Sequence, residues 1–141
     1  PTGHTLLLLD ATGAYHREVA RQMQSGTVHF TTPMMQLQDT RQTKVLIVTL
    51  AETTPVLEVA NLQEDLRRAK IEPWAWIINN SLAYASPTAP LLRQRAAGEL
   101  QQIKAVATKY ARRWAIVPLQ AEEPVGIERL QQLARHERTQ P

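Results

Sequence analysis

Cysteine is absent from all 141 residues of this chain. Without thiols, these residues form no disulfide bond and no zinc or iron–sulfur site that depends on cysteine. The absence fits a cytoplasmic protein, because disulfides belong mainly to oxidising compartments.

Long hydrophobic runs are also missing. The longest apolar stretches are Leu6–Leu9 and Trp74–Ile78. Both are far shorter than the roughly 20 residues that a membrane-spanning helix needs. We therefore expect none of these residues to cross a bilayer.

Glycine is scarce, with five residues in the whole chain, and none of them precedes a lysine. The Gly-rich loop that cradles a triphosphate ends in Gly-Lys followed by Ser or Thr, and dinucleotide sites use Gly-x-Gly-x-x-Gly. Neither pattern occurs, so these residues alone carry no recognisable means of holding phosphate groups.

Charge of one sign is not concentrated in any segment. The net charge is +3 and aromatic residues make up 5% of the chain. The basic residues form three separate groups: Arg67–Lys70, Arg93 with Arg95, and Arg112–Arg113. A nucleic-acid surface needs a basic stripe with interleaved aromatics. We expect ordinary solvated faces and no nucleic-acid partner.

Three short apolar runs are present, and they read as strands: Lys44–Leu50, Pro73–Asn79 and Ala115–Leu119. Each is apolar at both odd and even positions, as in strands covered on both faces. Helical patterns follow each run. The first begins with Thr54 as N-cap and Pro55 at the first helical position, and the others cover Leu91–Arg113 and Ile127–His136.

Strands that alternate with helices predict an α/β fold, with parallel strands joined by right-handed crossovers. In the long helix we expect Leu92, Ala96, Leu100, Ile103, Val106 and Tyr110 near one face, and in the last helix we expect Leu130 and Leu133 to point inward.

The first forty residues are less clearly patterned. Leu6–Leu9 fits either a buried strand or a short buried helix. Ala14–Gln24 has helical spacing, and Thr32-Pro33 is a plausible start for a short helix that runs to about Gln38.

Open parallel sheets bind ligands beyond the carboxyl ends of their strands. The candidate segments are therefore Ala51–Thr54, Asn79–Ser81 and Gln120–Gly126. Asn79-Asn80 stands out among them. A turn is the simpler explanation, because Asn tolerates the left-handed conformation. The alternative is base recognition, since an Asn amide offers a donor and an acceptor that match an adenine edge.

Other polar groups carry weaker indications. The four histidines, at positions 4, 16, 29 and 136, show no metal-ligand spacing, and surface or capping roles explain them except for His4, whose neighbours are considered below. Glu122-Glu123 is better explained as a solvated turn than as an acid–base pair.

Several segments resemble the arsenical pump-driving ATPase family. The opening PTGHT is similar to the second part of that family's DTAPTGHT signature, so we expect Asp-Thr-Ala before Pro1. Further similarity to the second, C-terminal nucleotide-binding half of these enzymes lies in GHTLLLLDATGAYHRE, HFTTPMMQLQD, TKVLIVTLAETTPVLE, WAWIINNSL and IVPLQAEEPVGIERL.

The resemblance implies a parallel-sheet, deviant P-loop NTPase-like fold, present only as its C-terminal portion with three parallel strands and crossover helices. It implies one partial domain: a switch segment and helical region over 1–43, and an αβ core with the adenine-binding edge over 44–141. Family members run Gly-His-Thr into a helix, which favours a helix for His4–Leu9.

The resemblance also implies roles for particular residues. His4 matches the signature histidine at the metalloid site, as a ligand or its partner. Asn79 matches the asparagine that reads adenine, with Asn80 as its neighbour. Pro118 and Leu119, with the loop to Glu123, match the wall of the adenine pocket. No catalytic residue is expected here, since the phosphate loop and the signature Asp would precede Pro1.

The implied function is metalloid-stimulated ATP hydrolysis that drives arsenite or antimonite export. The implied ligands are ATP and Mg²⁺, with As(III) or Sb(III) as allosteric metalloid. The implied partners are the first nucleotide-binding half of the same parent chain and a membrane arsenite carrier, which would hold a cytoplasmic protein at the inner membrane. We expect the isolated chain to be inactive and to self-associate.

Two other interpretations stay open. The tail-anchored-protein-targeting ATPases share the signature but need a long hydrophobic helical insertion to bind client helices, and the short stretch between Leu9 and Lys44 argues against one. A non-catalytic interaction module would use an unpaired strand edge and apolar surface.

Overall fold

The computed structural model describes residues 8, 11, 13–15, 18, 21 and 31–136, except for the side chains of 135 and 136. The chain divides into two compact units. One comprises Pro1–Val45 with Asn61–Trp74, and the other comprises Leu46–Ala60 with Ala75–Pro141. The predicted division into 1–43 and 44–141 stays a prediction.

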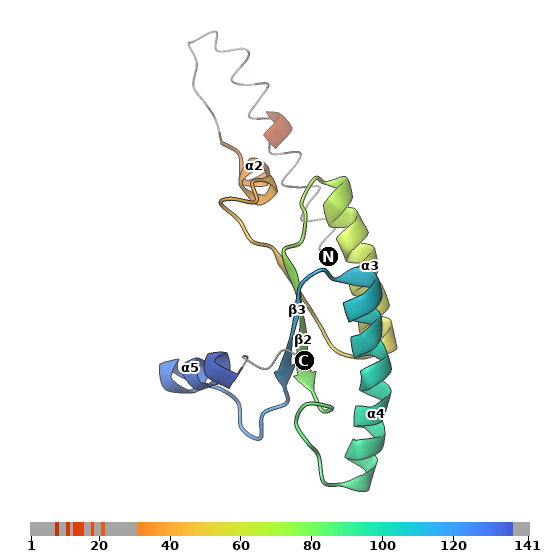
Figure 1. Ribbon diagram of the computed structural model, residues 1–141. Coiled ribbons are helices and arrows are strands. Elements are labelled where there is room, and N and C mark those ends of the chain that lie inside the picture. The colour runs from red at the N-terminus through yellow and green to blue at the C-terminus, as the bar shows by residue number, and fades with distance from the viewer. Residues whose placement is uncertain are drawn as a thin grey trace. The chain divides into compact units, whose positions relative to one another are not determined.

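The second unit is built on a parallel sheet. Its strands are β1 (Leu46–Thr49), β2 (Ala75–Ser81) and β3 (Trp114–Pro118), in the order β1-β2-β3. Leu46 pairs with Ala75, and Trp76 pairs with Trp114, both in parallel. The three predicted runs therefore form the expected sheet, and the α/β fold class is confirmed (Figure 1).

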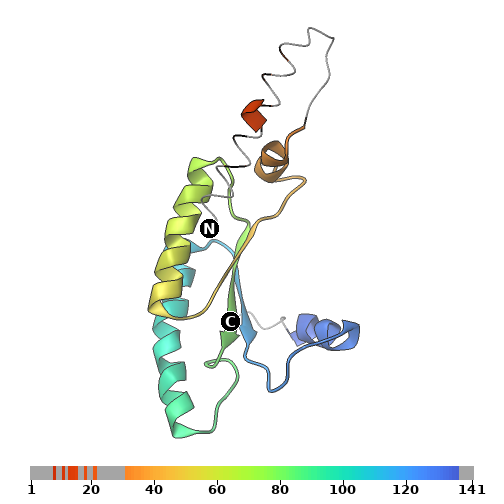
Figure 2. The same ribbon diagram turned by 180° about the vertical axis from the view of Figure 1, so that it is seen from behind.

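Helices cover one face of this sheet. Helix α4 (Pro90–Ala105) and the first half of α3 (Thr53–Arg68) lie on the same side of the strands in both views (Figures 1 and 2). Two right-handed crossovers between neighbouring strands place both helices on one face. The buried apolar side chains of this unit are those of Ile47, Ala51, Val56, Ala75, Trp76, Ile78, Leu82, Ala96, Ile103 and Val106.

The opposite face is open at β1 among the described residues, so the expectation of strands covered on both faces is wrong for this strand. In β1 the side chains alternate, with Ile47 and Thr49 buried and Leu46 and Val48 exposed. A run that is apolar at both odd and even positions indicates that both faces of the strand avoid water. It does not say which segment of a protein covers each face.

The end of the long helix differs from the prediction. Helix α4 passes into a π-helical turn, η1 (Val106–Tyr110), and stops before Arg113. There Ala111 takes an extended conformation, and its N–H donates to the carbonyl of Val106 at 2.9 Å. The last turn packs by stacking Tyr110 on Trp76, with ring centroids 5.7 Å apart and planes 11° from parallel.

The face that α4 buries is also rotated from the predicted one. Ala96, Ile103 and Val106 are buried as expected, but Leu92 and Leu100 are exposed, and Glu99 is buried instead. The buried residues of α4 form a stripe next to the predicted one. Because α4 is only weakly amphipathic and offers more than one apolar side, tertiary packing decides which side is buried.

Helix α5 (Ile127–His136) has the predicted bounds. Its predicted inward face is wrong for Leu130, which is exposed together with Ile127, while Leu133 is half-buried. Spacing identified the amphipathic helix, but it could not identify what the apolar stripe packs against.

The first unit contains α2 (Pro33–Gln38), which begins where predicted. The Thr32 side chain accepts a hydrogen bond from the Met35 N–H at 3.2 Å, and Pro33 occupies the first helical turn. The Gln38 side-chain amide donates to the carbonyl of Ala69 at 2.8 Å, which joins α2 to the segment that follows α3.

Charged groups of the first unit show shifted pKa values. The backbone N–H of Arg41 donates to the Asp39 carboxylate at 2.9 Å and lowers the pKa of that carboxyl below its ordinary value. The Arg67 guanidinium contacts Glu72 and Glu64, and the hydrogen bonds to Glu72 raise the pKa of Arg67.

Near the N-terminus, the described residues 8, 11, 13–15, 18 and 21 are all helical. This agrees with a helix over Ala14–Gln24, and with a helical state of Leu8 within Leu6–Leu9. His4 lies outside the described residues. No helix in the described part of the chain is long and apolar enough to cross a membrane.

Candidate functional site

The carboxyl ends of β2 and β3 bring two predicted segments together. Ser81 pairs with Pro118, and the Leu119 N–H donates to the Ser81 carbonyl at 3.0 Å. Asn79 and Asn80 therefore lie beside Pro118 and Leu119 at one edge of the sheet. This is the edge where parallel sheets bind ligands.

Asn79 and Asn80 do not form the turn that composition favoured, because β2 continues through Ser81. The ladder with β3 shifts register between Ile78 and Ser81, and Asn80 has a φ of 54°. Three steps along β2 match two along β3, so β2 carries a bulge of one extra residue. Asn suits this place since it tolerates the left-handed region.

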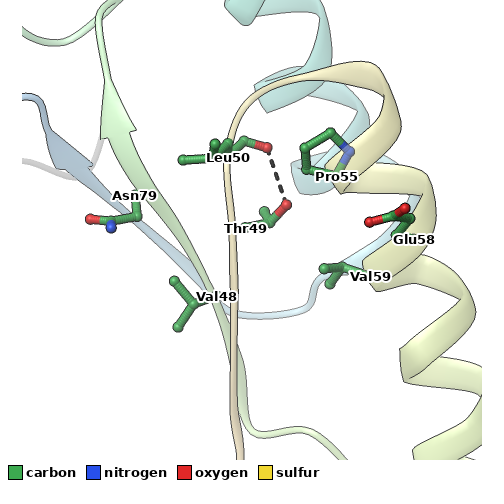
Figure 3. Close-up of a pocket in the computed structure, with 7 residues that line it drawn as sticks. All are labelled: Val48, Thr49, Leu50, Pro55, Glu58, Val59 and Asn79. Atoms are coloured by element: carbon green, nitrogen blue, oxygen red, sulfur yellow. Dashed lines mark hydrogen bonds between the residues drawn. The ribbon is translucent and has the colours of Figure 1, made fainter. Parts of the chain in front are cut away.

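A recess of about 290 Å³ lies at the end of β1 and includes Asn79. Figure 3 shows the Asn79 side chain extending away from Pro55 and Glu58. The recess is lined by Val48, Thr49, Leu50, Pro55, Glu58, Val59 and Asn79. Small-molecule sites run from about 300 to 1,000 Å³, so this recess lies at the lower limit of that range.

The segment after β1 is tied to α4. Helix α3 begins at Thr53, two residues before the predicted first helical position at Pro55, so the prediction of Thr54 as N-cap is wrong and Thr54 lies within the helix. The Val56 N–H donates to the Glu52 carbonyl at 3.0 Å, which starts the helical hydrogen bonds two residues early. The Arg95 guanidinium contacts the Glu52 carboxylate at 2.6 Å, and the Gln102 amide donates to the Thr53 hydroxyl at 3.1 Å.

The segment after β3 is shaped by its own contacts. The Gln120 side-chain amide donates to the Pro118 carbonyl at 2.9 Å, and Gly126 adopts a φ of 88° just before α5. Glu122 forms an ion pair with Arg129 at 2.8 Å. Since both Glu122 and Glu123 are exposed, this loop fits the solvated turn that the sequence suggested.

A buried carboxyl group on α4 completes the site, and sequence reasoning missed it. Oε2 of Glu99 accepts hydrogen bonds from the Ser81 hydroxyl at 2.9 Å and from the Ala83 N–H at 3.1 Å. The spacing of Glu99 from Ala96 and Ile103 could have revealed it, because steps of three and four place it on the buried stripe.

The described residues form no group of three or more His, Asp or Glu side chains that could hold a metal ion. The amide and apolar groups at the carboxyl edge suit a planar heterocyclic base, because the amide can meet a donor and an acceptor at once.

Comparison with known proteins matches the chain to a family model described as anion-transporting ATPase, over residues 1–136. An arsenical pump-driving ATPase of Acidiphilium multivorum is 68% identical over 133 residues, which is 94% of this chain and 23% of that protein. One of Escherichia coli is 66% identical over 135 residues, which is 95% of this chain and 23% of that protein. The chain thus spans about a quarter of the length of these relatives.

Proposed function

Because this chain belongs to the anion-transporting ATPase family, we propose that it is the C-terminal part of the second nucleotide-binding half of an arsenical pump-driving ATPase. The observation that carries the proposal is 66–68% identity over about 94% of the chain to proteins of that name. We call this longer ATPase the full-length protein. It hydrolyses ATP to drive arsenite or antimonite export.

The contribution of these residues is recognition of the adenine base. Asn79 presents an amide with a donor and an acceptor, and Asn80 follows it at the bulge. Half-buried Pro118 and exposed Leu119 flank the same edge and form an apolar wall for the base. Their arrangement at the carboxyl ends of two parallel strands supports this assignment.

Phosphate and Mg²⁺ binding belong to other parts of the full-length protein, since this chain has no Gly-Lys loop. ATP with Mg²⁺ supplies the phosphoryl group for hydrolysis. The residues present here hold and orient the base end of the nucleotide, and no described residue takes part in the phosphate chemistry.

The metalloid role falls to His4, which matches the histidine of the family signature. Imidazole can serve as a ligand of As(III) or Sb(III), or as a partner of another ligand. The soft thiolates that such metalloids prefer must come from elsewhere in the full-length protein, because the chain has no cysteine.

The partners that follow are the first nucleotide-binding half and a membrane carrier for the metalloid. The full-length protein would work on the cytoplasmic side and reach the inner membrane through that carrier. Metalloid binding between the two halves would couple to both ATP sites through one conformational change.

Substitution of Asn79 by Ala tests the base assignment in the full-length protein. We expect the preference for ATP over GTP in kcat/KM to fall about tenfold or more, since a site loses discrimination when its hydrogen-bonding group is removed. The kcat at saturating ATP should change less than this ATP-to-GTP preference. An unaltered ATP-to-GTP ratio would contradict the assignment of Asn79.

A further inference from the structure

We propose that Glu99 is a positioning residue for base recognition, which sets the conformation of Asn79–Ser81 from beneath the sheet. This inference rests on the proposed function, because it assigns a cause to the placement of the base-reading amide. Glu99 is separated from that amide by the sheet and acts through Ser81.

The bulge turns Ser81 toward Glu99. Ile78 and Ser81 are both fully buried, although side chains three positions apart in a regular strand point to opposite faces. The extra residue, Asn80 in the left-handed conformation, restores Ser81 to the helix-covered face. Asn79 is left on the opposite, open face.

Ser81 is held from two directions. Its hydroxyl donates to Glu99 at 2.9 Å, and its carbonyl accepts the Leu119 N–H at 3.0 Å. The same Glu99 oxygen accepts the Ala83 N–H at 3.1 Å, which fixes the chain just past the strand. One oxygen atom thus anchors Ser81 and Ala83, which both follow the bulge, and the Leu119 N–H binds the Ser81 carbonyl beside it.

The burial of Glu99 argues for a specific acceptor at this position. Only 7% of the residue is exposed, and it lies between Ala96 and Ile103 on the core stripe of α4. A buried polar group is unfavourable unless its hydrogen bonds are made. An apolar residue here would leave the Ser81 hydroxyl and the Ala83 N–H without this acceptor.

Neighbouring polar residues of α4 extend the same arrangement. Arg95, Glu99 and Gln102 are spaced four and three apart, so they share one side of the helix. Arg95 and Gln102 contact Glu52 and Thr53 after β1. The Arg95–Glu52 pair is solvent-exposed and contributes little. Glu99 is the buried member, so the positioning effect resides mainly there.

The test compares Glu99→Leu, Glu99→Gln and Ser81→Ala in the full-length protein, with kcat/KM for ATP and for GTP as the measurement. Glu99→Leu should lower the ATP-to-GTP ratio about tenfold, which corresponds to about 1.4 kcal/mol of lost discrimination. Glu99→Gln should keep most of the ratio, because both donors reach the same oxygen and an amide retains one. Ser81→Ala should give a smaller loss in the same direction.

Gln101→Leu is the matched control, since Gln101 is exposed on the same helix and its replacement should leave the ratio unchanged. A stability loss in Glu99→Leu with an unchanged ratio would overturn the inference, as would a Gln variant no better than Leu. If Glu99→Leu does not fold, Ser81→Ala decides, and an unchanged ratio there overturns the inference. Normal selectivity in Asn79→Ala would instead refute the proposed base contact itself.

Discussion

At the scale of single residues, the conformation of Asn80 determines how the carboxyl edge is built. Its φ of 54° would strain most other side chains, and the residue is exposed, so packing does not explain its identity. The sequence indicated that Asn79 and Asn80 interrupt a strand. It could not distinguish a turn from a bulge, because Asn suits both.

Asn80→Val should therefore destabilise the chain. A β-branched residue in the left-handed region costs about 1–2 kcal/mol, and we expect the free energy of unfolding in urea to fall by that amount. Asn80→Gly is the control, since glycine adopts the same backbone conformation without strain. Equal losses in both variants would show that the Asn side chain, and not its backbone conformation, stabilises this place.

At the scale of helices and strands, local patterns predicted existence and bounds better than orientation. The Thr32-Pro33 start of α2, the bounds of α5 and the three strands all rest on caps, β-branched runs and short-range spacing. The faces of α4 and α5 depend on what packs against them, and that information is not local. The spacing on α4 could have placed Glu99 on the buried stripe, but it could not have identified its donors, because Ser81 lies in β2 and Ala83 just after it.

Thr32→Ala should weaken α2. The hydroxyl of Thr32 caps the Met35 N–H of a six-residue helix, and loss of such a cap costs about 1 kcal/mol. Urea unfolding followed by circular dichroism measures the change. Thr32→Ser keeps the capping oxygen and should stay close to the wild-type value, and a full loss in that variant would assign the effect to the buried methyl group.

At the scale of the whole molecule, the open face of the sheet matters most. The exposed side chains of Leu46 and Val48 lie on β1 and that of Leu50 directly follows it, and β1 is an edge strand of the described sheet. An apolar edge strand is a place where chains pair with one another. The similarity of the sequence to proteins about four times as long makes such a surface less surprising.

We expect the isolated chain to self-associate through β1 and to hydrolyse no ATP. Val48→Lys should shift light scattering toward the monomer. Leu57→Lys is the control, because Leu57 is similarly exposed, at 52% against 57% for Val48, but lies on α3. A clean monomer of the unmodified chain at high concentration, or measurable turnover by the purified chain, would contradict these expectations.

The extra residue in β2 also has a genetic consequence. An in-frame deletion of the codon for Asn80 would remove the bulge and leave Ser81 two positions after Ile78. Because side chains two positions apart in a regular strand share a face, the hydroxyl of Ser81 would still point toward Glu99 and Ser81 would still pair with Pro118. Gene variants in this family should therefore tolerate the loss of this codon more readily than the loss of a codon elsewhere in β2, which would turn each residue past the deletion to the other face.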